Sequence, residues 1–160
     1  MKVGDLCDRN PVTVSVAAPA SDAARLMCEE DIGVVVVTAA SSEQPIPVGM
    51  LTDRDIVCAQ LDRAVDLGQL RIGDIMTVDP LVLNEDTPVE QAIHLLRNRR
   101  VRRAPVIGHS GELIGVISFD DLLVQVSGNL RSLAWLAQLR SWPPRHERRH
   151  GYWVKPGTAE

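Results

Sequence analysis

The sequence predicts an α+β fold made of two copies of one strand-helix-strand-strand-helix (β-α-β-β-α) unit. Residues 3–59 recur as residues 72–125, with glycines, prolines and leucines at matching positions. Each copy ends its last predicted strand with a hydroxyl residue that is followed three positions later by an aspartate. A repeat of this length fixes the architecture before any single motif is interpreted.

The two copies are expected to pack against each other. The chain has 160 residues, of which 45% are hydrophobic, so it can fill the core of one compact domain. Each copy alone has fewer than about 60 residues, a size that buries too little surface for comfortable stability.

The first copy shows its elements in order. Alternating apolar residues at 12–16 predict a short strand, and an apolar face after Pro19 predicts a helix. The continuous apolar run at 33–37 is typical of a strand buried on both faces. After a polar turn, residues 48–51 form another strand, and a second helix begins at Thr52.

The second copy repeats this order, with a strand at 81–83 and a second helix that begins at Ser118. Thr87, Pro88 and Glu90 have the pattern of a capped helix start, with a hydroxyl N-cap, proline at the first helical position and an acid three residues after the cap.

The predicted organisation comprises five segments. They are a first repeat at 1–62, a linker at 63–71, a second repeat at 72–127, a C-terminal helix extension at 128–142 and a basic tail at 143–160. The extension is predicted because apolar residues recur every three or four positions as far as Trp142, where two prolines follow. The short tail is expected to be mobile or to make a dimer contact. Alternatively, its basic and aromatic residues bind RNA.

Composition argues against several functional classes. No apolar run approaches the roughly 20 residues that span a bilayer, and the N-terminus lacks a signal-peptide pattern, so a cytoplasmic protein without membrane contact is expected. Cys7, Cys28 and Cys58 are too widely spaced for a zinc site or a disulfide framework. They are expected to be small buried hydrophobes.

A zinc-protease pattern near the C-terminus is expected to be accidental. His146, Glu147 and His150 match it, but prolines precede the motif and Gly151 follows it at once. The chemistry needs both histidines on one face of a buried helix and a third ligand. With no other nucleophile and base in view, we expect neither a metal nor catalysis.

The repeated hydroxyl and aspartate pair allows two interpretations. Thr52 with Asp55, and Ser118 with Asp121, have the spacing of a capping box, which alone would stabilise each helix by roughly 1 kcal/mol. The same carboxylate could instead accept from ribose hydroxyls beside a helix N-terminus that attracts phosphate. A glycine three positions before each hydroxyl would let backbone approach a ligand closely. Because the pair occurs twice in register, we favour the functional interpretation.

Several linked motifs together resemble a known family. They are the Gly-x-x-Thr/Ser-x-x-Asp pair, the Asp-Ile-Met-Thr-x-x-Pro segment at 74–80 and the Arg-Arg-Ala-Pro-Val-Ile segment at 102–107. The chain is similar over residues 3 to about 127 to the tandem cystathionine-β-synthase (CBS) domain pair, or Bateman module. Residues 31–33 and 50–56 further resemble small stand-alone bacterial members without an attached enzyme.

The resemblance implies an architecture and a class of ligand. In that family the repeats pack through their sheets around a pseudo-twofold axis, and two clefts take adenosine ligands such as AMP, ADP, ATP, NAD or S-adenosylmethionine. Asp55 and Asp121 are thereby implied to hold ribose, and Thr52 and Ser118 to contact ribose or phosphate. Paired modules commonly form a dimer, so a homodimer is expected.

A run of arginines makes the copies unequal. Five arginines lie between residues 97 and 103, whereas the aligned stretch of the first copy, 28–34, is acidic. Such a run is often a solvated face, but the resemblance places Arg102 and Arg103 near the phosphates of a ligand. We therefore expect the second copy's cleft to favour a charged nucleotide, and the other cleft, with mainly Arg54, to be weaker, empty or selective for a less charged adenosine ligand.

The leading hypothesis is a non-catalytic adenine-nucleotide sensor that needs no obligatory cofactor and uses AMP or a related molecule as effector. On binding, it would alter its own packing or that of an unidentified protein partner. The alternative is a ligand-free dimerisation module in which both hydroxyl and aspartate pairs only cap helices. RNA binding through the tail is a more remote alternative.

Overall fold

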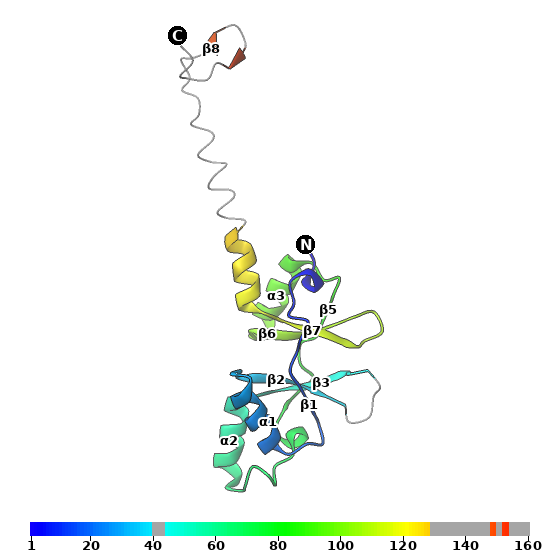
Figure 1. Cartoon of the computed structure of the whole chain (residues 1–160), viewed down its shortest axis with the longest axis vertical. Helices are drawn as coiled ribbons and strands as arrows, with labels where there is room; N and C mark the ends of the chain where they lie inside the picture. The colour runs from blue at the N-terminus through cyan, green and yellow to red at the C-terminus, as the bar shows by residue number, and fades with distance from the viewer. Residues whose placement is uncertain (40–43, 129–147, 150–151, 154–160) are drawn as a thin grey trace. The chain divides into compact units, whose positions relative to one another are not determined.

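The computed structural model describes residues 1–39, 44–128, 148–149 and 152–153. The chain divides into two compact units, Met1–Leu122 and Leu123–Glu160. Both predicted repeats lie almost entirely in the first unit, which contains two sheets (Figure 1).

The first repeat has the predicted order of elements. It comprises β1 (Thr13–Ser15), α1 (Ala20–Glu29), β2 (Val34–Thr38), β3 (Pro47–Thr52) and α2 (Asp53–Arg63). β1 pairs in parallel with β2, and β2 pairs antiparallel with β3. The parallel pairing follows from the helix between the two strands, which returns the chain to the same end of the sheet.

The second repeat has the same order. It comprises β5 (Leu83–Asn84), α3 (Val89–Arg99), β6 (Arg103–Ile107), β7 (Leu113–Ser118) and a helix over residues 119–128. The pairings again run parallel from β5 to β6 and antiparallel from β6 to β7. The predicted fold class, two β-α-β-β-α repeats, is therefore confirmed.

Each repeat gives its leading segment to the other repeat, which the sequence did not predict. The N-terminal 3-10 helix η1 (Val3–Asp5) places Val3 in the core of the second repeat, and η2 (Ile72–Asp74) places Ile72 in the core of the first. Both side chains are fully buried, and burying a residue of this size contributes about 2 kcal/mol. The exchange makes the two repeats one folding unit.

Backbone hydrogen bonds hold the exchanged segments in equivalent ways. The N–H groups of Val3 and Gly4 donate to the carbonyls of Thr87 and Glu85, both at 2.9 Å. Sixty-nine positions later, Ile72 and Gly73 donate to the corresponding carbonyls of the first repeat, each at 3.0 Å. Beyond η2, β4 (Thr77–Val78) joins the first sheet beside β3.

This exchange changes the start of α3. The predicted Thr87 cap does not form: Pro88 occupies the N-cap position, α3 begins at Val89, and no side chain caps it. The backbone of Thr87 instead accepts from Val3, and Pro88 forms a bridge with Lys2. Pairing with the exchanged segment holds Pro88 in an extended conformation, with a ψ of 143°.

The two faces of each sheet have different partners. Val35 and Val37 pack in the core with α1 and α2, whereas Val36 between them points to the opposite face. Val36 is 1% exposed although it belongs to neither core, and the same holds for Pro105 on β6. These faces are turned toward the neighbouring repeat, and Figure 1 shows the two sheets next to each other with α1 and α2 on one side and α3 on the other.

In the second unit, β8 (Arg148–Arg149) pairs with β9 (Tyr152–Trp153). The two arginines in the middle of the zinc-protease pattern are therefore in a strand, whereas the protease chemistry requires a helix there. The remainder of the predicted extension after residue 128, and of the tail, lies outside the described residues. Among the described residues, no helix has the length and apolar character required to cross a membrane.

Candidate functional site

The hydroxyl and aspartate pairs form two equivalent capping boxes. Asp55 Oδ2 accepts from the Thr52 backbone N–H at 2.9 Å and from the Thr52 hydroxyl at 2.7 Å, while Thr52 Oγ1 accepts from the Asp55 N–H at 3.1 Å. The corresponding distances for Ser118 and Asp121 are 2.8, 2.6 and 3.2 Å. Both helices are thus capped as the sequence predicted.

The capping hydrogen bonds leave one oxygen of each carboxylate available as an acceptor. In each pair only Oδ2 accepts these hydrogen bonds, and Oδ1 of Asp55 and of Asp121 accepts none from the described residues. A carboxylate has about four lone-pair positions. The structural and functional interpretations are therefore compatible, because a ligand hydroxyl can donate to the remaining oxygen.

Two clefts lie between the repeats, and each has walls from both. The Ser118 cleft has a volume of about 240 Å³, and the Thr52 cleft has one of about 570 Å³. The Ser118 cleft is lined by residues 8, 10–12, 32, 34–36, 50, 103, 116, 118 and 121. The Thr52 cleft is lined by residues 33, 34, 50, 52–54, 77–81, 99 and 101–103. Only the larger volume falls within the range of about 300–1,000 Å³ that is typical of small-molecule sites.

Arg102 lies at a different cleft from the one expected. Arg102 lines the Thr52 cleft together with Arg54, and Arg103 lines both clefts. The prediction that the arginine run serves the second copy's own hydroxyl and aspartate is therefore wrong for Arg102. The reason is that each cleft joins the helix N-terminus of one repeat to the strand start of the other.

The charges around the two clefts differ in sign. The Thr52 cleft brings together four arginines and two aspartates: Arg54, Arg99, Arg102, Arg103, Asp53 and Asp79. The Ser118 cleft has one arginine, Arg103, and two aspartates, Asp8 and Asp121. An anionic ligand is therefore attracted to the Thr52 cleft and discouraged from the Ser118 cleft.

Arg102 is held in place by its neighbours. Its guanidinium lies 3.5 Å from the carboxylate of Asp120, and its Cζ lies 5.4 Å from the centroid of the Phe119 ring. The Phe119 N–H also donates to the Arg102 carbonyl at 2.7 Å. Both charged side chains are largely exposed, so this ion pair contributes little to stability.

Three charged residues that line the Thr52 cleft were not predicted to be part of a site. Arg99 belongs to the arginine run, which was a usable signal. Asp79 has a φ of 50°, a left-handed conformation that aspartate adopts more readily than most residues. Asp53 begins α2 next to Thr52. Conversely, Asp55 is not among the residues that line this cleft, although Asp121, in a capping box of the same geometry, lines the other cleft.

The glycines before each hydroxyl have a role within the fold. A Cβ on Gly115 would lie 2.5 Å from the Asp8 carbonyl oxygen, and one on Gly49 would meet the side chain of Met76. The space beside each glycine, which was predicted to admit a ligand, is thus occupied by the chain itself. The exchanged segments pair with the sheets at these points. These segments then continue along the walls of the clefts.

Two of the cysteines differ from the prediction. Cys7 is buried, and burial raises the pKa of its thiol, so it remains a neutral packing group. Cys28 and Cys58 are exposed, because they lie on the outer sides of α1 and α2. Among the described residues no group of histidine, cysteine and acidic side chains could hold a metal ion.

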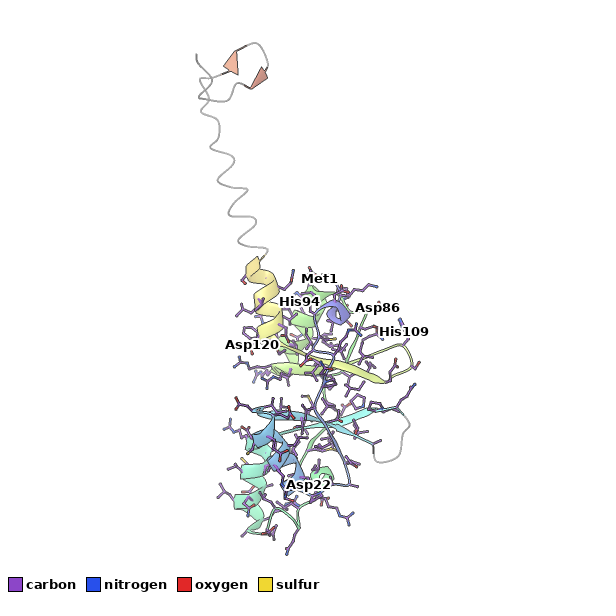
Figure 2. The ribbon with its side chains drawn as sticks, in the orientation of Figure 1. Met1, Asp22, Asp86, His94, His109 and Asp120 are labelled. Atoms are coloured by element: carbon purple, nitrogen blue, oxygen red, sulfur yellow. The ribbon has the colours of Figure 1, made fainter. Side chains whose placement is uncertain are left out.

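The remaining histidines lie away from the clefts. His109 Nε2 lies 3.3 Å from Asp86 and 3.8 Å from Glu85. Figure 2 shows His109 and Asp86 close together, at the end of the unit near Met1. Neither His109 nor His94 lines either cleft.

Comparison with known proteins identifies the family. A sequence model of the CBS domain matches residues 3–62 and 72–128. The chain therefore belongs to the CBS domain family and carries two copies of the domain.

Curated relatives align with most of this chain. An uncharacterized protein from Methanopyrus kandleri is 30% identical over 123 residues, which cover 77% of this chain and 61% of the relative. The chain thus spans less than two thirds of that relative's length. The CBS domain-containing protein YhcV of Bacillus subtilis is 30% identical over 127 residues, covering 79% of this chain and 86% of YhcV.

Solved structures show the same fold. A CBS domain protein from Pyrobaculum aerophilum, solved in complex with AMP, is 25% identical, with a TM-score of 0.69 over 80% of this chain and 99% of that chain. A hexameric CBS-CP12 protein from bloom-forming cyanobacteria is 31% identical, with a TM-score of 0.65 over 77% of this chain and 69% of that chain.

Proposed function

We propose that the protein is a non-catalytic sensor that binds an adenine nucleotide in the Thr52 cleft. The observation that carries this proposal is the convergence of four arginines on a cleft of about 570 Å³ at the N-terminus of α2. Guanidinium groups match the geometry of phosphate, and a helix N-terminus favours an anion. The similar protein from P. aerophilum that binds AMP supports the same class of ligand.

Each predicted residue keeps a proposed role. Thr52 and Asp55, the pair that caps the helix at one cleft, and Ser118 and Asp121, the pair at the other, are proposed to contact ribose. Arg54, Arg102 and Arg103 are proposed to contact phosphate. AMP, ADP, ATP and NAD are the candidate effectors, and binding is proposed to alter the packing of the protein or of a partner.

A thermal-shift experiment with a panel of nucleotides tests the proposal. A ligand at about 100 times its Kd stabilises the folded state by about 2.7 kcal/mol, which raises Tm by several degrees in a domain of this size. The panel comprises AMP, ADP, ATP, NAD and S-adenosylmethionine. If none of them raises Tm, the nucleotide-sensor proposal fails.

Replacement of Arg103 gives a sharper test. Arg103→Ala should weaken AMP binding about tenfold or more, about 1.4 kcal/mol, because Arg103 borders both clefts. Isothermal titration calorimetry measures the change. Arg97→Ala is the matched control, since Arg97 belongs to the same run on α3 but lines neither cleft. Unchanged affinity in Arg103→Ala would remove Arg103 from the site.

A ligand-free dimerisation module is the second candidate. The capping boxes are complete without a ligand, and α2 exposes two apolar side chains, Val57 (57% exposed) and Leu61 (76%). Such side chains on one helix fit a contact between copies. A dimer in light scattering together with no thermal shift would favour this candidate. Homodimerisation, a cytoplasmic location and RNA binding by the tail stay predictions.

A further inference from the structure

Arg103 occupies a position between the two clefts. In the β6–β7 pair it lies opposite Ser118, and its side chain also borders the cleft that contains Thr52 and Arg54. Its side chain makes no hydrogen bond or ion pair with any residue in the described part of the chain, and Arg103 is exposed to solvent. The guanidinium is therefore free to turn toward an anion in either cleft.

The first repeat has no counterpart to this cation. The position equivalent to Arg103 is Val34, which lies opposite Thr52 in the β2–β3 pair and also borders both clefts. Two symmetric repeats would place two cations between the clefts. This chain places one there.

We infer that the two clefts share Arg103, so that a phosphorylated nucleotide bound in one cleft weakens binding of a second in the other. This inference rests on the proposed function. One planar guanidinium makes its bidentate contact with a single phosphate at a time. The coupling is reciprocal, as thermodynamic linkage requires.

Because the clefts share Arg103, they should also prefer different classes of ligand. The Thr52 cleft retains Arg54, Arg99 and Arg102 whichever way Arg103 turns. The Ser118 cleft without Arg103 has only Asp8 and Asp121 as charged groups on its walls. When the Thr52 cleft holds a phosphorylated nucleotide, the Ser118 cleft favours an adenosine ligand without phosphate.

Blocking one cleft with a large side chain tests whether Arg103 then contacts a ligand in the other cleft. Val101 lines only the Thr52 cleft, and its equivalent Ile32 borders the Ser118 cleft but not the Thr52 cleft. Val101→Trp is designed to fill the Thr52 cleft. The Ser118 cleft of this variant should then bind AMP with a Kd at least fivefold lower than the Kd of the second binding step in the unmodified protein. Calorimetry measures both values. Ile32→Trp is the matched variant, and it should leave the first, tighter step intact.

Two further variants distinguish the sharing of Arg103 from a nonspecific effect of the introduced tryptophan. The gain in Val101→Trp should disappear when Arg103→Ala is added. Val34→Arg supplies the missing second cation, so its second AMP step should strengthen at least fivefold while its first changes less. Circular dichroism shows whether Val101→Trp folds. If it does not fold, Val34→Arg still tests the inference.

The failure of this inference differs from the failure of the proposed function. If the unmodified protein binds no nucleotide, the proposed function fails. If it binds AMP, but Val101→Trp binds no more tightly than the unmodified second step and Val34→Arg changes neither step, the clefts are independent and the sharing of Arg103 is overturned.

Discussion

The two clefts are built from equivalent parts of the duplicated unit, yet they differ in size and charge. Each joins a capped helix N-terminus of one repeat to the strand start of the other. The Thr52 cleft is more than twice as large and has an excess of arginines, whereas the Ser118 cleft has an excess of aspartates. The two repeats thus share the arrangement of elements and capping boxes at the sites, whereas the side chains around them differ.

This comparison explains why a charge in one repeat serves the other repeat. The arginine run ends α3 and leads into β6, which faces the Thr52 end of the first repeat. The acidic stretch that ends α1 in the first repeat contributes no side chain to the Ser118 cleft, whose aspartates are Asp8 and Asp121. The charge difference between the clefts therefore comes mainly from the arginine run of the second repeat, which lines the cleft at the capped helix of the first.

The largest expected effect is on the free energy of unfolding, at the two glycines where the exchanged segments pack against the sheets. An added methyl on Gly115 would lie 2.5 Å from the Asp8 carbonyl oxygen, which belongs to backbone. On Gly49 the nearest atom belongs to the flexible Met76 side chain. We expect Gly115→Ala to lower the free energy of unfolding by about 3 kcal/mol and Gly49→Ala by about 1 kcal/mol. Urea denaturation measures both, and equal losses would show that the two packing contacts are equally tight.

The next prediction compares the two aspartates. Asp55→Asn and Asp121→Asn should each lower the free energy of unfolding by about 1 kcal/mol, because their capping boxes have nearly the same geometry. Each should also weaken AMP binding about tenfold in its own cleft if it holds ribose as proposed. Urea denaturation and calorimetry separate the two effects. A loss of stability without loss of affinity in Asp55→Asn would reduce Asp55 to a helix cap, in keeping with its absence from the cleft wall.

Much of the fold was predictable because it depends on local patterns. The strands and helices follow from apolar periodicity, and the Thr52 cap follows from a hydroxyl and an acid at the right spacing. The roles of Val3 and Ile72 were not predictable, since nothing in a short apolar segment says which repeat will bury it. For the same reason Arg102 was assigned to the wrong cleft, because a sequence alignment of the copies does not show which repeat faces which.

The ends of the equivalent helices α1 and α3 provide a smaller test of the divergence. Asp31 and Arg100 hold the same position, and both are left-handed, with φ of 52° and 55°. Aspartate tolerates this conformation better than arginine does, so Arg100→Gly should raise the free energy of unfolding by about 0.5 to 1 kcal/mol. Asp31→Gly should change it less. A larger gain for Asp31→Gly in urea denaturation would contradict this account.

The smallest effect concerns the two exchanged segments. Lys2 Nζ lies 2.7 Å from Asp86, whereas the corresponding positions in the other segment are Arg71 and the uncharged Ala17. The hydrogen bond from Lys2, followed by the Coulomb attraction of Lys2 and His109, lowers the pKa of Asp86. A carboxyl whose pKa is lowered by folding stabilises the protein above its unfolded pKa, about 4, and loses that contribution as pH falls through the lowered folded pKa. The difference in urea midpoint between the unmodified protein and Lys2→Met should therefore be small at neutral pH, because the pair is exposed, and should vanish as the pH falls through the lowered pKa of Asp86. Arg71→Met, which has no equivalent acid, should show no such pH dependence, and a matching dependence there would mean that Lys2 and Asp86 do not distinguish the two segments.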